Sequence, residues 1–201
     1  DSIGANHGTL ENGAAVTPAG HVGQALSFDG VNDYVGTPLI PLPTGLTFEA
    51  WIRTTSTDAI SDYLGNAALN VLGDSRNSVS LGFGVHGGVA RYSHYDYVLD
   101  PGGSGGAWRF STGTSTISDG AWHHIAVSHH RDSGNIVLYV DGTVEATGNI
   151  PYAWPFFSDD SAIVAVDRIG AGHNNLDAFV GQIDEATVYG RPLSPTEVQG
   201  I

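Results

Sequence analysis

The chain of 201 residues contains no cysteine and no lysine. Without cysteine it can form neither a disulfide framework nor a thiolate metal site. That absence argues against a protein of the animal extracellular space and favours a bacterial secreted protein. The sequence also lacks an N-x-S/T glycosylation sequon, which agrees with this interpretation.

Positive charge is scarce, because all seven basic residues are arginines and the net charge is −14. Binding to nucleic acid needs clustered cations that neutralise phosphates, so nucleic acid is excluded as a partner. An anionic membrane surface is disfavoured for the same reason. The acidity is compatible with bound divalent cations or simply with a solvated acidic surface.

Long apolar runs are also missing. No stretch approaches 18 apolar residues and no signal-peptide pattern opens the chain, so we expect no membrane insertion. The length suits a single domain over residues 1–201. Because the sequence begins at Asp1 within a recognisable segment, we expect a monomeric module cut from a larger secreted protein.

A hairpin at residues 121–142 organises the chain. Two apolar strands, 121–129 and 135–141, flank the polar turn 131–134. Ile136 and Leu138 point to one face while Val137 and Tyr139 point to the other, so the second strand is apolar on both sides. Strands of this kind are central in packed sheets. The hairpin therefore predicts the middle of an antiparallel β-sandwich.

Further strands are predicted on both sides of this hairpin. A strand, a turn and a second strand occupy residues 25–37, after which Pro38, Pro41 and Pro43 should break the ladder. Alternation predicts a strand at 46–54, two or three short strands within 60–85, and strands at 162–169 and 179–189. Residues 194–200 form one short helix at most, with Ser194 as N-cap.

Several motifs follow one another in an order that resembles a known family. They are Leu26-Ser27-Phe28-Asp29-Gly30, Leu46-Thr47-Phe48-Glu49-Ala50-Trp51-Ile52, Trp122-His123-His124-Ile125-Ala126-Val127, Leu138-Tyr139-Val140-Asp141-Gly142 and Gly181-Gln182-Ile183-Asp184-Glu185. Together they resemble laminin-G-like domains of the concanavalin A-like lectin/glucanase superfamily. The resemblance implies an all-β antiparallel jelly-roll sandwich of two sheets. It does not imply one function, because such domains bind sugars, proteins or nothing known.

Asp184 is the strongest chemical signal. Both faces of its strand look covered, and a buried carboxylate needs a cation or several hydrogen bonds. The resemblance implies a structural calcium held by Asp184, the carbonyl of Gly30, and Asn6 or Asp1, which are the oxygen ligands that calcium prefers. The alternative is a carboxylate satisfied by backbone amides. Asp29, Asn32 and Asp33 form another oxygen-rich turn, readable either as a second calcium site or as ordinary turn chemistry.

Two aromatic stretches, 86–109 and 150–161, are longer than a compact domain needs. Sugars present apolar faces that stack on aromatic rings, while acids and amides bind their hydroxyls. The candidate stacking residues are Tyr92, Tyr95, Tyr97 and Trp154, and the candidate polar contacts are Asp96 and Asn174. The alternative for each aromatic residue is a place in the core.

Other chemistries fit less well. The pairs His123-His124 and His129-His130 lack the helical spacing of a zinc motif. Residues 82–87 match G-x-G-x-x-G, but no helix follows to cradle a phosphate. Hydrolysis of a glycan needs two placed carboxylates, and no two of the five glutamates lie within three residues of each other.

We therefore predict a non-catalytic module that binds a polysaccharide or glycan, contains calcium and is secreted. The alternatives are a protein-interaction or adhesion spacer module and, less favoured, a polysaccharide hydrolase or lyase.

Overall fold

Antiparallel β-strands make up the fold in the computed structural model, which describes residues 7–41, 45–57, 69–73, 81–96, 107–130, 133–149, 165–172 and 178–201. The strands of this part are β1 (Thr9–Glu11), β2 (Ala15–Thr17), β3 (Ala25–Asp29), β4 (Tyr34–Pro41), β5 (Gly45–Arg53), β6 (Leu69–Gly73), β7 (Leu81–His86), β8 (Val89–Asp96), β9 (Ala107–Thr116), β10 (Trp122–His130), β11 (Asn135–Val140), β12 (Thr143–Asn149), β13 (Ala165–Ile169) and β14 (Val180–Tyr189). One helix, α1 (Pro195–Val198), follows them.

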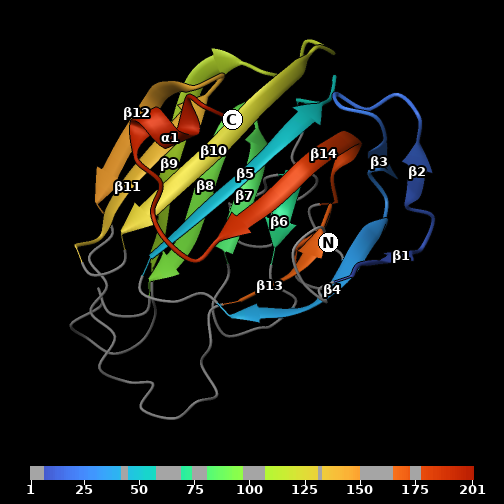
Figure 1. The fold of residues 1–201 in the computed structure, drawn as a ribbon, viewed down its shortest axis with the longest axis horizontal. Coiled ribbons are helices and arrows are strands. Elements are labelled where there is room, and N and C mark those ends of the chain that lie inside the picture. The colour runs from blue at the N-terminus through green and yellow to red at the C-terminus, as the bar shows by residue number, and fades with distance from the viewer. Residues whose placement is uncertain are drawn as a thin grey trace.

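The strands form two sheets that face each other (Figure 1). One sheet has the strand order β1-β4-β13-β6-β7-β8-β9, and the other has the order β12-β11-β10-β5-β14-β3-β2. We call them the first and second sheet. Many neighbours are far apart in sequence, as where β14 pairs with both β3 and β5. The predicted all-β jelly-roll sandwich is confirmed.

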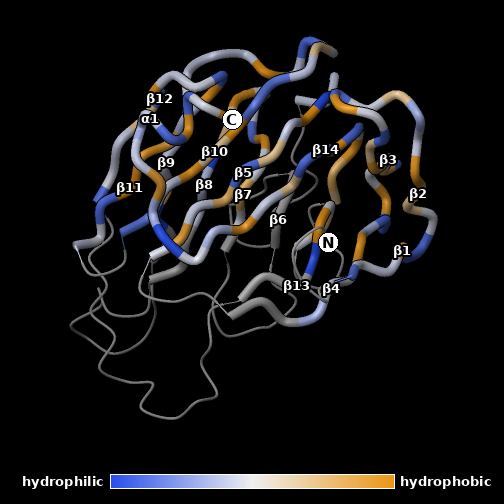
Figure 2. Tube along the Cα trace, in the orientation of Figure 1, coloured by the Kyte–Doolittle hydropathy of each residue, from blue (hydrophilic) through white to orange (hydrophobic). Residues whose placement is uncertain are grey.

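The predicted hairpin is confirmed as β10 and β11, which pair from Ile125–Val140 to His130–Asn135. On its other side, β10 pairs with β5. The middle strand of the second sheet is β5, and not a strand of the hairpin. Alternate side chains of these strands point into the sandwich, where Phe48, Ile125 and Leu138 are fully buried. Figure 2 shows the resulting alternation of hydrophobic and hydrophilic residues along the strands. This shared layer of side chains is the main core.

A second, smaller core covers part of the outer face of the second sheet. Ala126 and Tyr139 pack there against Leu193 and Val198. Val198 belongs to α1, whose N-cap is Ser194 as predicted, and a capping box joins Ser194 to Glu197. The helix thus explains why β10 and β11 are apolar on both faces.

Pro38 does not end β4, contrary to prediction. β4 continues to Pro41 and pairs with β13 on both sides of Pro38, at Gly36–Arg168 and at Ile40–Val166. The register shifts between these two pairs. A proline that cannot donate to a ladder is tolerated at such a bulge, so the irregularity takes up Pro38 and the strand resumes.

A carboxylate joins the two sheets where their edge strands meet. Glu145 on β12 accepts hydrogen bonds from the backbone amides and the hydroxyls of Thr114 and Ser115 on β9, at distances of 2.6–3.1 Å. β12 and β9 are edge strands of different sheets. The Ser115 and Thr114 hydrogen bonds lower the pKa of Glu145 from its ordinary value of 4.5 to about 2. Glu145 therefore fastens one side of the sandwich.

We expect Glu145→Gln to lower the free energy of unfolding at neutral pH by about 1 kcal/mol, because an amide group cannot accept all four hydrogen bonds. The folded-state pKa is depressed, so the stabilisation is present above the ordinary value of 4.5 and is lost as the pH falls towards about 2. Urea unfolding of both proteins across this range measures the difference. Glu11→Gln is the matched control. An equal effect of both substitutions would contradict a stabilising role for the Glu145 hydrogen bonds between the two sheets.

Candidate functional site

Asp184 lies on β14 opposite Trp51 of β5 and is only 6% exposed. Its Oδ2 accepts a hydrogen bond from the amide of Val22 at 2.9 Å, and its Oδ1 accepts one from the amide of Glu185 at 2.9 Å. A Cβ atom on Gly20 would lie 2.8 Å from Oδ2, so the loop of residues 20–23 fits closely around this oxygen. Backbone amides thus bind both oxygens of Asp184, which is the alternative that the sequence left open.

Gly30 does not lie close to Asp184, as a calcium ion shared by the two residues would require. In the β3–β14 ladder Asp29 pairs with Val180, while Leu26 pairs with Ile183. Gly30 therefore lies beyond one end of this ladder and Asp184 beyond the other, about 13 Å apart or more at the usual rise of a strand. Calcium ligands lie at 2.3–2.6 Å from the ion. The two residues cannot bind one ion, and the ligand set implied by the resemblance is corrected on this point.

Tyr92 is a core residue. Its side chain is 0% exposed, and its hydroxyl lies 3.0 Å from Nδ1 of His129. A ring buried between the sheets cannot stack on a sugar, so the predicted ligand contact at Tyr92 is wrong. The alternation of β8 is the cause: Tyr92 pairs with Phe83, and both residues belong to the main core.

The other predicted ligand contacts are only partly placed. The backbones of Tyr95 and Asp96 end β8, where they pair with Trp108 and Ala107 of β9. Tyr97, Trp154 and Asn174 lie outside the described residues, as do the predicted metal ligands Asp1 and Asn6.

A buried polar group that sequence reasoning missed lies on the outer face of the second sheet. His124 on β10 and Glu49 on β5 are 3% and 2% exposed, and His124 Nε2 lies 2.8 Å from a Glu49 oxygen. The hydroxyl of Tyr189 donates to the other oxygen at 3.2 Å. Alternation along β5 predicts that Glu49, Trp51 and Arg53 share one face of the strand. Only the register between β5 and β10 brings His124 to it, and one sequence does not reveal register.

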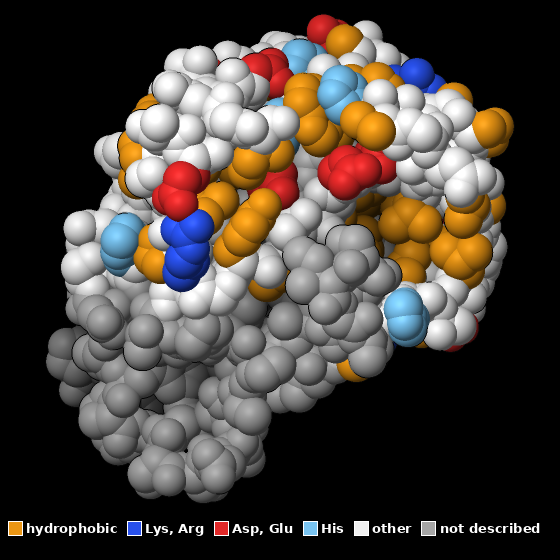
Figure 3. Space-filling view, in the orientation of Figure 1, with side chains coloured by type: hydrophobic (Ala, Val, Ile, Leu, Met, Phe, Trp, Pro, Cys, Tyr) orange, Lys and Arg blue, Asp and Glu red, His pale blue; other side chains and the backbone are white. Residues whose placement is uncertain are grey.

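A hollow of about 220 Å³ opens beside the bulge of β14. Most of its lining is apolar, and Gln24, Asp184 and Glu185 supply polar atoms; the apolar residues are Val16, Ala25, Leu26, Ile183 and Ala186. Glu185 has a left-handed backbone with φ +48° and is exposed. Hydrophobic side chains gather on this side of the molecule, towards β2 and β3 (Figure 3).

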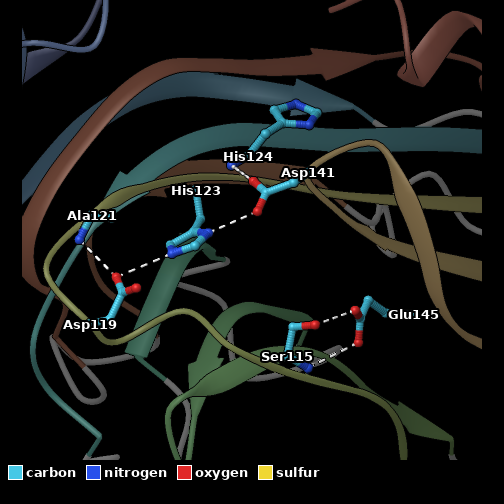
Figure 4. A network of polar contacts seen from close by, with 7 residues as sticks. All are labelled: Ser115, Asp119, Ala121, His123, His124, Asp141 and Glu145. Atoms are coloured by element: carbon cyan, nitrogen blue, oxygen red, sulfur yellow. Dashed lines mark hydrogen bonds and ion pairs between the residues drawn. The ribbon is translucent and has the colours of Figure 1, made fainter.

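His123 bridges two aspartates at the start of β10 (Figure 4). Its Nδ1 lies 2.9 Å from Asp141 and its Nε2 lies 3.2 Å from Asp119. Partial burial acts to lower the pKa of His123, but the hydrogen bonds and charges of Asp141 and Asp119 outweigh it, so the pKa is raised. Asp141 also accepts from the amide of His124, at 2.9 Å. This group holds together the two turns that flank β10 and β11.

Within the described ranges, no group of three or more His, Cys, Asp and Glu side chains could hold a metal ion. No helix in these ranges has the length and hydropathy to cross a membrane.

Two antiparallel sheets closed around one core, with a short helix on the outer face, define the class of concanavalin A-like jelly rolls. Residues 29–199 match the model of a laminin G family described as the concanavalin A-like lectin/glucanases superfamily. The chain belongs to this family.

Solved structures share the architecture at low sequence identity. Domain 4 of AbnA, a GH43 extracellular arabinanase from Geobacillus stearothermophilus solved in complex with arabinotriose, matches with a TM-score of 0.65 and 17% identity, over 96% of this chain and 86% of that one. The binding domain of Paraclostridial Mosquitocidal Protein 1 matches with a TM-score of 0.65 and 14% identity, over 97% of this chain and 46% of that one. These likenesses establish the fold.

Curated relatives match a part of the chain. Human neuronal pentraxin-1 is 32% identical over 88 residues, which are 42% of this chain and 20% of that protein. A rat protein with sushi, von Willebrand factor type A, EGF and pentraxin domains is 29% identical over 93 residues, 45% of this chain and 3% of that protein. The chain thus spans a fifth or less of these two relatives.

We expect Asp184→Asn to destabilise the fold by about 1–3 kcal/mol, because an amide nitrogen would face a backbone N–H that now has an acceptor. The amide of Val22 should exchange its hydrogen faster as the loop of residues 20–23 loosens. Urea unfolding and hydrogen exchange measure the two effects. Glu185→Gln, a change at the exposed neighbour, should leave the stability and the exchange rate unchanged. Equal effects of the two variants would contradict the role of Asp184 in holding the loop of residues 20–23.

The bridge at His123 predicts a pH dependence of stability. The folded-state pKa is raised above 6.5, so the contribution is fully present below this value and declines as the pH rises through the raised pKa. Titration of the imidazole by NMR should give a pKa above 6.5 that falls towards it in Asp119→Asn. A His123 pKa at or below 6.5 that is unchanged in Asp119→Asn would contradict the bridge.

Proposed function

We propose that this chain is a non-catalytic carbohydrate-binding module of a larger secreted protein. The observation that carries the proposal is the fold match to domain 4 of AbnA, a domain of an extracellular enzyme that was solved with arabinotriose bound. That match covers nearly all of both chains. A further structural relative is a putative carbohydrate-binding protein from Bacteroides ovatus, with a TM-score of 0.51 and 15% identity, over 96% of this chain and 45% of that one.

The binding site we propose begins where β8 ends. Tyr95 and Asp96 are the last two residues of β8, and Tyr97 follows directly. Tyr95, Tyr97 and Trp154 supply stacking surfaces for the apolar faces of sugar rings, and Asp96 and Asn174 bind hydroxyls. Tyr92 has no part in this site, because its ring fills the core.

The described glutamates support binding without catalysis. Glycoside hydrolysis needs one carboxyl group as acid and a second as base or nucleophile, both facing the substrate. Glu49 is buried against His124, Glu145 is held by Thr114 and Ser115, and Glu197 pairs with Arg191 at 2.6 Å. Three of the five glutamates are thus engaged in the scaffold. The proposal includes a monomeric module, a secreted location and a bacterial source.

A protein-interaction or adhesion module is the second candidate. The hollow beside β14 favours it, together with the neighbouring side chains of Val16 and Val22, which are 52% and 61% exposed. Contiguous apolar surface of this kind marks contact sites in soluble proteins. A contact there with another domain of the same polypeptide would leave the sugar site at β8 free.

A glycan screen tests the proposal, with arabino-oligosaccharides as the first ligands because of the AbnA complex. We expect saturable binding to at least one glycan class without turnover, and at least a tenfold loss of affinity in Trp154→Ala, since stacking on an aromatic ring is lost. Isothermal titration measures the affinity, and reducing-end analysis detects turnover.

Tyr92→Phe is the matched control, because it keeps the buried ring and removes only the hydroxyl bound to His129. Its affinity per folded molecule should equal that of the unsubstituted chain. Absence of binding across the screen, or full affinity in Trp154→Ala, would reject the proposed site. Release of reducing ends would assign the chain to the enzymes instead.

A further inference from the structure

Strand β14 contains a bulge at the point where it parts from β3. Three residue steps from Asp184 to Thr187 face two steps on β5, so β14 holds one extra residue here. The ladder with β3 ends at the pair Ile183–Leu26. Glu185 lies in the bulge with a φ of +48°, a conformation that residues with side chains rarely adopt. Bulges redirect side chains and are common beside binding sites.

The hollow beside this bulge reaches the edge of the main core. Its volume is about 220 Å³, and Leu26 and Ala186, which line it, also pack against the core. Val16 of β2 pairs with Leu26 and is 52% exposed, so part of the apolar wall faces solvent. A cavity of about 150 Å³ can bind benzene, whereas pockets for small-molecule ligands begin at about 300 Å³. The hollow therefore has room for one large side chain.

A carboxylate without a partner lies at the opening of the hollow. Glu185 lines the hollow and is exposed, and its side chain forms no hydrogen bond or ion pair with the described residues. The neighbouring carboxylate of Asp184 is held by the amides of Val22 and Glu185. Among the described residues, the lining includes no arginine or histidine. The hollow thus offers one unpaired negative charge beside an apolar wall.

Long basic side chains match this combination. Lysine and arginine cover apolar surface with their aliphatic stems and keep their charged groups at the rim. An acidic group would be repelled by Glu185, and a purely apolar side chain would leave that carboxylate without a counter-charge. The chain has no lysine of its own and a net charge of −14, so its field attracts basic partners. Arginine is also among the residues that contribute most to binding in protein interfaces.

We propose that the hollow beside β14 binds a lysine or arginine side chain of a protein partner. The aliphatic stem lies against Val16, Leu26 and Ala186, and the charged group pairs with Glu185. This contact is separate from the sugar site proposed at the end of β8 and requires no glycan.

NMR titration of the purified chain with blocked tripeptides tests the site. The probes are acetylated valine–lysine–valine amide and its counterparts with arginine, norleucine or glutamate at the centre. With both basic peptides we expect saturable shifts in the amides of residues 16, 24–26 and 183–186. Their affinity should be about two- to fivefold above that of the norleucine peptide, which is the contribution of a solvent-exposed ion pair, and added salt should reduce the difference. The glutamate peptide should not bind.

Glu185→Gln removes the charge and keeps the size of an exposed side chain, so the variant should fold. We expect it to lower the affinity for the basic peptides to that of the norleucine peptide. Glu11→Gln is the matched control, because it removes an equal charge outside the hollow. It should retain the preference for the basic peptides.

Four results would overturn the proposal: no saturable shift with either basic peptide, equal affinity for the lysine and norleucine peptides, a preference that survives Glu185→Gln, or shifts centred outside the hollow. Arabino-oligosaccharides in the same titration separate this contact from the sugar site. Shifts of residues 183–186 with the glycan would assign the hollow to the sugar instead. A glycan screen without any ligand would reject the sugar site alone, because the peptide titration contains no glycan.

Discussion

Burial of β5 and β10 on both faces is the constraint on which the rest of the structure depends. Their inner faces fill the core between the sheets, and part of their outer face lies beneath Leu193 and Val198. Every polar side chain on that outer face must therefore find a partner within the protein. Thr47 accepts from the amide of Leu193 and donates to the carbonyl of Arg191, and Ser128 donates to the carbonyl of Leu193. The polar residues of the sheet thus fix the C-terminal segment that covers them.

The same constraint accounts for the Glu49–His124 pair. A lone carboxylate at this depth would be strongly destabilising, but His124 and Tyr189 each bind one of its oxygens. Removal of either partner would leave a buried charge incompletely satisfied. The Trp-His-His segment is structural on this evidence: Trp122 packs edge-on near His21, His123 ties two turns, and His124 lies within hydrogen-bonding distance of Glu49.

The local sequence pattern was sufficient to predict the elements in which apolar and polar side chains alternate regularly. Strand β5, the β10–β11 hairpin and the capped helix α1 follow from residues close together in the chain. The same reasoning failed for Pro38, because a bulge against β13 accommodates it and β13 lies more than 120 residues away. Local pattern also separates a core aromatic from an exposed one poorly, as Tyr92 shows, because both kinds alternate in the same way.

Non-local register explains the remaining differences at the candidate site. Gly30 and Asp184 both flank the β3–β14 ladder, and only its alignment shows that they lie at opposite ends. The fold family could be recognised from motifs spread along the chain, whereas a ligand set requires distances between strands that a motif does not contain. Transfer of ligands from a resemblance is therefore weaker than transfer of a fold.

The buried and partly buried carboxylates of the described residues differ in how fully their oxygens are hydrogen-bonded. Glu49 is satisfied by a histidine and a tyrosine, and Asp184 is satisfied by two backbone amides. Even the partly exposed Glu145 receives four hydrogen bonds. Among the described residues, Oδ1 of Asp33 is buried without a hydrogen-bond partner, as are Oγ1 of Thr37 and Oε1 of Gln182. A Cβ atom on Gly13 would lie 2.7 Å from Oδ1 of Asp33, so the turn of residues 11–14 packs closely on Asp33 at the energetic cost of one unsatisfied acceptor.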